Sequence, residues 1–124
     1  MDPLVIRFDE TKEYYTEERC HILELSNSAA DSELSIARAR VEPGVTTAFH
    51  RVLQTAERYV IISGSGCVDI DGLDTTSVTP GDVVLIPPDV KQRISNTGDE
   101  DLVFLALCTP RFQPENYLHD EGCT

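Results

Sequence analysis

The sequence is short of basic side chains and has no long apolar run. Its 124 residues include 10 Lys and Arg against 22 Asp and Glu, a formal net charge of −12. Nucleic acids and anionic membranes are bound through basic patches, so we expect neither among its partners. No apolar stretch approaches the roughly 20 residues that cross a bilayer. Residues 1–4 show no signal-peptide pattern, which predicts a cytoplasmic location.

Closely spaced cysteine pairs are also missing. The chain has 4 cysteines, and no two of them form a C-x-x-C pair. In a chain without an export signal, such scattered cysteines are typical of free thiols rather than of a disulfide framework. The residues expected to be free thiols are Cys20, Cys67, Cys108 and Cys123.

Short apolar segments separated by Gly, Pro and Asp turns fill most of the chain. We expect eight to ten short strands, no helix, and a single all-β domain that is a sandwich or barrel. Residues 4–8 are predicted as a strand. Residues 102–108 are apolar at every position, so we expect that strand to lie between two layers.

The most informative stretch is 44–64, which carries a histidine and a glutamate on two predicted strands. His50 lies on the first strand and Glu57 opens the second. We expect these strands to be adjacent and antiparallel, with both side chains on one face. An imidazole next to a carboxylate can bind a metal or transfer protons.

Two motifs in the sequence resemble those of the cupin family of small jelly-roll barrels. The positions in register with the first motif are Gly44, His50, Glu57 and Gly64, with Val52 where the family has its second His. The second motif is matched at Gly81, Pro87 and Asn96, with Asp89 in place of Gly and Gln92 in place of His. The resemblance covers about residues 33–109. It implies a cupin barrel over this region. From the residues themselves we expect N-terminal strands within 4–25 and a tail, 110–124, that Phe112 and Tyr117 anchor over the barrel.

In cupins the corresponding side chains face the interior and hold one divalent metal. The resemblance therefore implies a metal site made of His50, Glu57 and Gln92, whose amide oxygen can act as a ligand. One nitrogen and two oxygens suit Fe²⁺ or Mn²⁺ better than Zn²⁺ or Ni²⁺, although the sequence does not choose among these ions. The alternatives are a core histidine for His50, a paired buried carboxylate for Glu57 and a hydrogen-bonded core amide for Gln92.

Three further residues are candidates for the site. Tyr59 follows Glu57 by two positions and shares its strand face, so it is either a proton donor or an aromatic core residue. Arg38 and Arg40 share one face of another strand. They bind substrate if that face is interior and are surface charges if it is exterior.

Two classes of function fit these residues. One is a metal-dependent enzyme acting on a small acid or sugar-like substrate, since isomerases, lyases, decarboxylases and oxygenases all occur on cupin folds. The other is a non-catalytic small-molecule-binding module with a degenerate or empty metal site, which Val52 and Gln92 favour. Both are compatible with a homodimer, in which the apolar segments 4–8 and 102–108 supply the interface.

Overall fold

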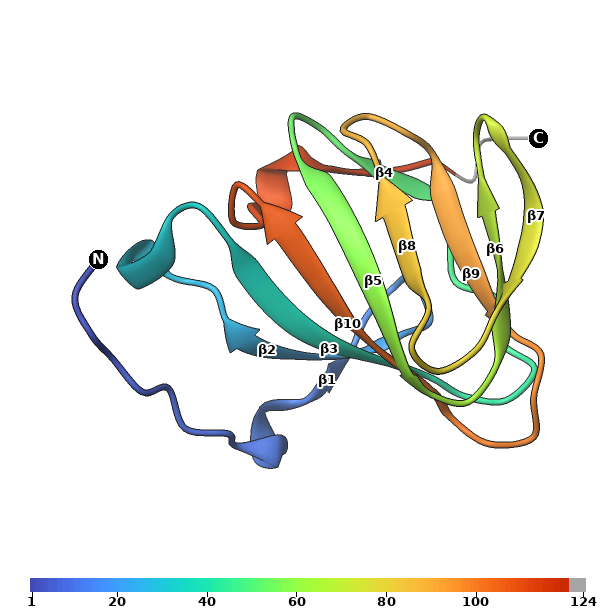
Figure 1. Ribbon diagram of the computed structural model, residues 1–124, viewed down its shortest axis with the longest axis horizontal. Helices are drawn as coiled ribbons and strands as arrows, with labels where there is room; N and C mark the ends of the chain where they lie inside the picture. Colours follow the sequence, from blue (N-terminus) through green and yellow to red (C-terminus); the bar gives the residue numbers. More distant parts are fainter. Residues whose placement is uncertain (121–124) are drawn as a thin grey trace.

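The chain folds into the predicted all-β jelly-roll barrel (Figure 1). The computed structural model describes residues 1–120, so Cys123 lies outside the described part. Within that part there are eleven strands and three short 3-10 helices, and no α-helix. No helix of residues 1–120 is long and apolar enough to cross a membrane.

The strands form two antiparallel sheets that face each other. The first sheet has the order β1-β2-β3-β10-β5-β8. Its strands span Tyr14–Tyr15, His21–Ser26, Ser35–Val41, Leu102–Thr109, Ala56–Ser63 and Val83–Ile86. The second sheet has the order β11-β4-β9-β6-β7. Its strands span Tyr117–His119, His50–Val52, Gln92–Asn96, Gly66–Ile70 and Leu73–Val78. The 3-10 helices η1, η2 and η3 span Glu10–Lys12, Ala29–Asp31 and Pro114–Asn116.

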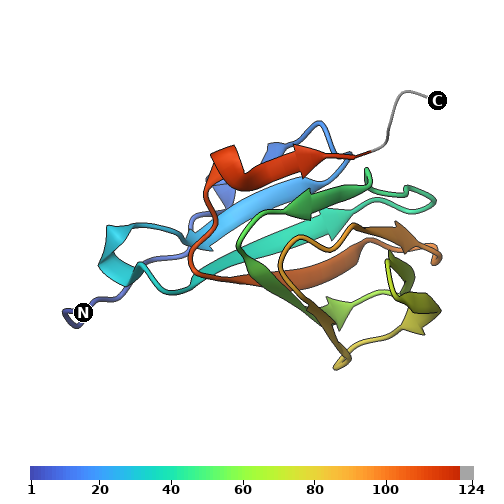
Figure 2. The same cartoon turned by 90° about the horizontal axis from the view of Figure 1, so that it is seen from above.

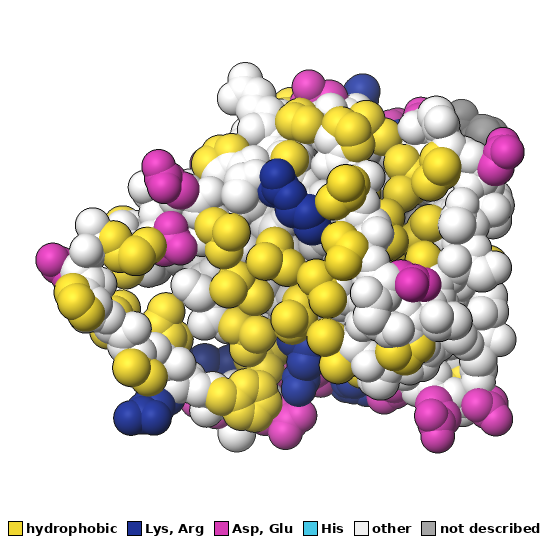
Figure 3. All heavy atoms as spheres, in the orientation of Figure 1, with side chains coloured by type: hydrophobic (Ala, Val, Ile, Leu, Met, Phe, Trp, Pro, Cys, Tyr) yellow, Lys and Arg dark blue, Asp and Glu magenta, His cyan; other side chains and the backbone are white. Residues whose placement is uncertain are grey.

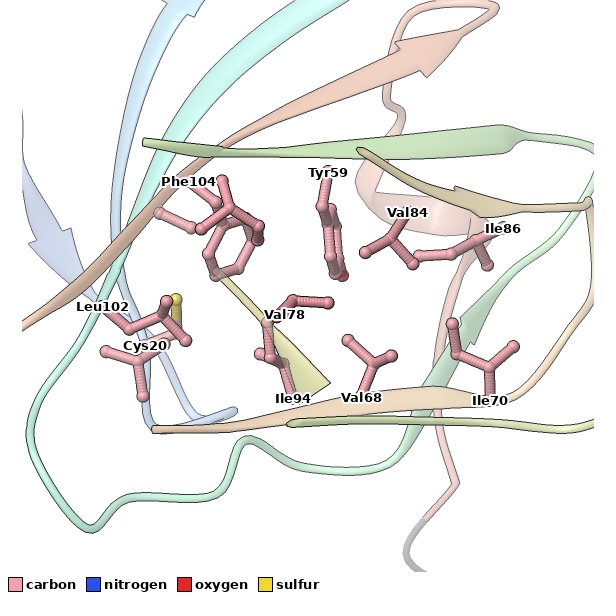
Figure 4. Packing of buried hydrophobic residues seen from close by; sticks show 13 residues of the cluster. Cys20, Tyr59, Val68, Ile70, Val78, Val84, Ile86, Ile94, Leu102 and Phe104 are labelled. Carbon is pink, nitrogen blue, oxygen red and sulfur yellow. The ribbon is translucent and has the colours of Figure 1, made fainter. Parts of the chain in front are cut away.

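The apolar core fills the space between the two sheets. Figure 4 shows Tyr59 and Phe104 pointing from the first sheet toward Val68 and Ile94 of the second. The rings of Tyr59 and Phe104 are tilted, with their centroids 4.5 Å apart. Inward and outward residues alternate along each of these strands, as the two-residue period of a strand requires.

Two of the motif positions are explained by backbone geometry. Gly64 ends β5 at φ 82°, and a Cβ there would lie 2.5 Å from the carbonyl oxygen of Asp101, so a side chain does not fit. Asp89, which replaces the Gly of the second motif, also has positive φ, 69°. Asp tolerates this region better than most residues. Its Oδ1 accepts a 3.0 Å hydrogen bond from the backbone N–H of Gln54, which joins the β8–β9 loop to the β4–β5 turn.

The N-terminal strand predicted over 4–8 is wrong. Residues 4–8 form an extended arm without strand pairing, which projects from the barrel in Figure 1. Its large apolar side chains, Leu4, Val5, Ile6 and Phe8, are 51–70% exposed. A strand forms only beside a hydrogen-bonding partner, and none of the described strands pairs with the arm.

The expected placement of 102–108 between two layers is also wrong. β10 is a central strand of the first sheet, and one of its faces points into the barrel through Phe104 and Cys108. The alternate residues Val103, Leu105 and Leu107 lie on the outer face and are only partly buried. An apolar residue on an outer face has the same sequence pattern as a buried one, which is why the prediction failed.

The C-terminal segment lies over the open end of the barrel, as expected from its aromatic residues. β11 pairs with β4, and Figure 2 shows the C-terminal segment, in red, along one side of the barrel. The carbonyl of Phe112 accepts a 3.0 Å hydrogen bond from the side chain of Asn27. Tyr117 donates a 3.3 Å hydrogen bond to the carboxylate of Glu18.

Candidate functional site

His50 and Glu57 face each other across the barrel instead of lying side by side. β4 belongs to the second sheet and β5 to the first, so the prediction of adjacent paired strands is wrong. The turn at 53–55 carries the chain from one sheet to the other, with Gln54 at φ 57°. His50 Nε2 and Glu57 Oε1 lie 3.9 Å apart, and the two side chains are 7% and 8% exposed.

The surroundings of His50 fix which ring nitrogen carries a proton. Nδ1 lies 3.1 Å from the carbonyl oxygen of Ala48 and 3.4 Å from a carboxylate oxygen of Glu18. Both neighbours are hydrogen-bond acceptors, so Nδ1 is protonated. In this tautomer the lone pair of Nε2 faces Glu57. The ring of Tyr117 stacks on that of His50 at a centroid distance of 5.0 Å.

Gln92 connects Glu57 to Tyr59 by hydrogen bonds inside the barrel. It lies opposite His50 in the β4–β9 pairing. Its amide nitrogen donates to Glu57 Oε1, and its amide oxygen accepts a 2.5 Å hydrogen bond from the hydroxyl of Tyr59. Gln92 is 1% and Tyr59 6% exposed. The chain of bonds orients the carboxyl of Glu57 toward His50.

Burial is the main cause of the pKa shifts in this cluster. It raises the pKa of the Glu57 carboxyl above its ordinary value, and the nearby imidazole of His50 offsets part of that effect. Burial, reinforced by Glu57, also raises the pKa of the Tyr59 hydroxyl well above its ordinary value. The Cys108 thiol, 3.7 Å from Glu57 Oε2, has a raised pKa for the same reasons. Tyr59 and Cys108 therefore stay protonated near neutral pH, and burial favours the protonated form of Glu57 as well.

As folded, the cluster does not form a complete set of metal ligands. Within residues 1–120, no group of three or more His, Cys, Asp or Glu side chains is arranged to hold a metal ion. The oxygen of Gln92 accepts the proton of Tyr59, so the atom that would bind a metal is already engaged. Val52 offers no donor atom. The three predicted ligands do lie together, and their metal role stays a prediction.

The cluster lies at the floor of a cavity of about 350 Å³. Buried side chains, among them His50, Glu57 and Tyr59, line its inner part. Its rim is made of exposed residues of β1, β2 and the C-terminal segment, among them Tyr14 and Glu24. The cavity therefore leads from solvent to the His50–Glu57 pair, and it is large enough for a small organic molecule.

Arg38 and Arg40 lie away from this cavity. Their neighbours on β3, Ala37 and Ala39, line it, so the two arginines point to the opposite, outer face. Both donate hydrogen bonds to Glu13, at 3.0 Å from Arg38 and 2.6 Å from Arg40. Arg38 and Arg40 therefore lie on the exterior face, the case in which we expected them to be surface charges.

Three residues that reach the site were not singled out for it from the sequence. Glu18 lies in the stretch 9–19, which shows no strand or helix period. Tyr117 was expected to anchor the tail, but its contact with His50 depends on the β11–β4 pairing. Cys108 was expected only as a free thiol. No local sequence pattern indicates these contacts, because they join segments far apart in the chain.

The fold and the site define a small double-sheeted barrel whose open end leads to buried polar side chains. A sequence model of the cupin domain matches residues 37–108. This chain belongs to the cupin family, and the matched segment falls within the region expected from its two motifs.

Two curated relatives show how far sequence similarity extends. An uncharacterised protein of Methanocaldococcus jannaschii is 31% identical over 111 residues, covering 88% of each chain. A glucose-6-phosphate isomerase of Pyrococcus furiosus is 36% identical over 78 residues, or 60% of this chain. The match spans only 39% of the isomerase.

Solved structures share the fold at low sequence identity. The nucleoside dehydratase Pac13 superposes with a TM-score of 0.78 at 12% identity, covering 98% of this chain and 95% of Pac13. A predicted oxalate decarboxylase of Thermotoga maritima superposes with a TM-score of 0.76 at 24% identity, covering 86% of this chain and 99% of that protein. These similarities concern the fold alone.

Proposed function

We propose that this cupin binds a small hydroxylated molecule in its cavity and transfers protons to and from it through His50 and Glu57. The observation that carries the proposal is the 3.9 Å separation of His50 Nε2 and Glu57 Oε1 at the cavity floor. This distance exceeds that of a direct hydrogen bond. One ligand oxygen placed about 2.8 Å from each atom bridges them.

The two side chains have complementary protonation. The lone pair of His50 Nε2 accepts a proton, while Glu57, whose pKa burial raises, donates one. The imidazole removes a proton from one ligand atom and the carboxyl gives a proton to another. When the product has left, the imidazolium returns its proton to the carboxylate, so the protons balance over one turnover. Such an exchange is the core of an isomerisation or a dehydration at a hydroxyl or carbonyl group. Tyr59 holds Gln92, and Gln92 holds Glu57, in the orientation that this requires.

The proteins that resemble this chain support the proposal. Glucose-6-phosphate isomerases are among its sequence relatives, and a nucleoside dehydratase shares its fold. Pac13 has also been solved with uridine, a small hydroxylated molecule. Isomerisation and dehydration both need a group that removes a proton and a group that supplies one.

A divalent metal held by His50, Glu57 and Gln92 is the second candidate. It is favoured by the contact of His50 Nδ1 with a backbone carbonyl, an arrangement common in metal-binding histidines because it leaves Nε2 as the ligand. It requires Gln92 to exchange the positions of its amide nitrogen and oxygen. The ion would supply Lewis-acid chemistry when bound.

The two candidates are separated by metal content and ligand binding measured on the same proteins. The first predicts that a sugar, polyol or nucleoside raises the melting temperature, that His50→Ala and Glu57→Gln abolish this shift, and that a chelator leaves it unchanged. His21→Ala is the matched control, since that ring pairs with Glu42 at 2.9 Å outside the site. Near-stoichiometric metal that falls in both His50→Ala and Gln92→Ala contradicts the first candidate and supports the second.

We also infer that the chain forms a homodimer through the outer face of the first sheet and the N-terminal arm. Figure 3 shows hydrophobic side chains gathered over this face and along the arm. The outer residues Ile62, Val83 and Leu85 are 49–70% exposed, as are those of the arm. Contiguous exposed apolar surface marks an interaction site, and a second copy of the chain covers both parts at once.

Sedimentation velocity tests the dimer. We expect a dimer for the wild type and a monomer for Leu85→Lys, with Leu73→Lys as a control because that exposed side chain lies on β7 of the other sheet. A monomeric wild type at micromolar concentration contradicts the inference.

A further inference from the structure

Several acidic side chains line the cavity. Its lining includes Glu17, Glu18, Glu24 and Glu57. Within residues 1–120, no Lys or Arg lines it, and its nitrogen bases are His50 and His119. This is more than a consequence of the acidic composition, because several arginines lie on the strands and loops around the cavity.

Each of those arginines is directed elsewhere. Arg38 and Arg40 point to the outer face and bond to Glu13. Arg58 donates to the hydroxyl of Thr109. Arg111 donates a 2.9 Å hydrogen bond to Asn27 without lining the cavity itself. These guanidinium groups thus lie outside the cavity, whereas four glutamate side chains line it.

Two further features of the cavity concern the ligand directly. His50 is 5% exposed, and its Nε2 points toward the floor with Glu57 Oε1 3.9 Å away, a gap that one oxygen atom fills. Aromatic rings, including those of Tyr14, Phe112 and Tyr117, line the walls. The faces of such rings attract cations and pack against uncharged rings.

We propose that the cavity takes hydroxylated molecules without an anionic group, either uncharged or carrying a protonated amine, and excludes carboxylates and phosphate esters. This inference rests on the proposed function, since it assumes that the ligand hydroxyl lies between His50 and Glu57. Field lines are focused in a narrow cavity with apolar walls, so the carboxylates repel anions there more strongly than they do at an open surface. The phosphate and oxalate groups in the names of two similar proteins would meet no cation here.

The electrostatic part is tested on the unaltered chain with two soluble nitroxides that differ only in charge, one bearing an amine and the other a carboxylate. Each enhances the relaxation of nearby amide protons in proportion to its local concentration. At each amide we take the ratio of the relaxation enhancement by the amine nitroxide to that by the carboxylate nitroxide. We expect this ratio to be at least about tenfold higher at the cavity rim, residues 14–24, than at Val83–Ile86 of the outer face. The double variant Glu18→Gln/Glu24→Gln should lower the rim ratio toward that of the outer face. Equal ratios at the two places in the wild type overturn the inference.

The ligand part is tested with matched sugars: glucose, glucosamine, glucuronate and glucose 6-phosphate. We expect melting-temperature shifts from the first two and at least about tenfold weaker binding of the last two. Glucuronate or glucose 6-phosphate binding as tightly as glucose overturns the inference, even if binding depends on His50. A sugar shift that survives His50→Ala instead contradicts the proposed function, while the nitroxide ratio still stands. If none of the four binds, the nitroxide ratio alone decides.

Discussion

Two polar clusters lie on opposite faces of the first sheet, and they handle charge in opposite ways. The outer cluster joins Glu13 to Arg38 and Arg40, so a carboxylate meets two guanidinium groups. The inner cluster joins Glu57 to Gln92 and faces His50. The same residue type, glutamate, is at the centre of both.

The comparison shows that the surroundings of a glutamate side chain, and not the residue type alone, set the pKa of its carboxyl. Hydrogen bonding to Arg40 lowers the pKa of Glu13 to about 2. Burial raises the pKa of Glu57. Glu13 is therefore always ionised near neutral pH and serves stability, whereas burial favours the protonated form of Glu57.

The largest expected effect comes from removing the amide that joins the inner cluster. Gln92→Leu leaves the buried carboxyl of Glu57 and hydroxyl of Tyr59 without their shared partner. We expect the free energy of unfolding to fall by about 3 kcal/mol, measured by urea denaturation. Gln113→Leu is the control, because that side chain makes no capping hydrogen bond at η3. Equal losses in the two variants would show that the inner chain of bonds contributes nothing.

A smaller effect, opposite in sign, is expected for Glu57→Gln. The folded-state pKa of Glu57 lies above the unfolded value, so its ionisation costs stability as pH rises between the two. The variant keeps the hydrogen-bonding shape without that cost. At pH 7 we expect it to be more stable than the wild type by about 1–2 kcal/mol, with the advantage gone near pH 4. A variant less stable than the wild type at pH 7 would show that the ionised carboxylate is the stabilising form.

The smallest effect is expected in the outer cluster. Glu13→Gln should cost about 1 kcal/mol at pH 7, because solvent weakens the pairs with Arg38 and Arg40. The pKa of Glu13 is lowered from 4.5 to about 2, so the wild-type advantage is complete above 4.5 and disappears as pH falls toward 2. Thermal unfolding across this range measures it. Glu10→Gln, at a 70% exposed side chain that also contacts Arg38, should show little change.

The fold was predictable because the cupin motifs contain residues that the backbone geometry requires. Gly64 allows no side chain, and the turn residues near it set the spacing that places His50, Glu57 and Gln92 toward the interior. The alternation that put Tyr59 on the same face as Glu57 is confirmed, since both are buried on β5.

The parts that could not be predicted depend on contacts between distant segments. Which sheet receives β4 and which receives β5 is a matter of topology, so the facing arrangement of His50 and Glu57 leaves no local pattern. Glu18 reaches His50 from a segment without periodicity. The hydrogen bonds of Gln92 decide whether its oxygen is available, and sequence alone does not report them.

The short β4–β5 turn connects the two strands that carry His50 and Glu57. Residues 53–55 separate the acid from the base in the chain and carry it from the second sheet to the first, so that His50 and Glu57 face each other. A one-residue slip of β5 against β10 and β8 would rotate Glu57 to the outside and bring its neighbours in. The bond between Asp89 and Gln54 fixes the turn from a second point in the chain. The site can therefore be altered by exchanging side chains, provided that the register of β5 is kept.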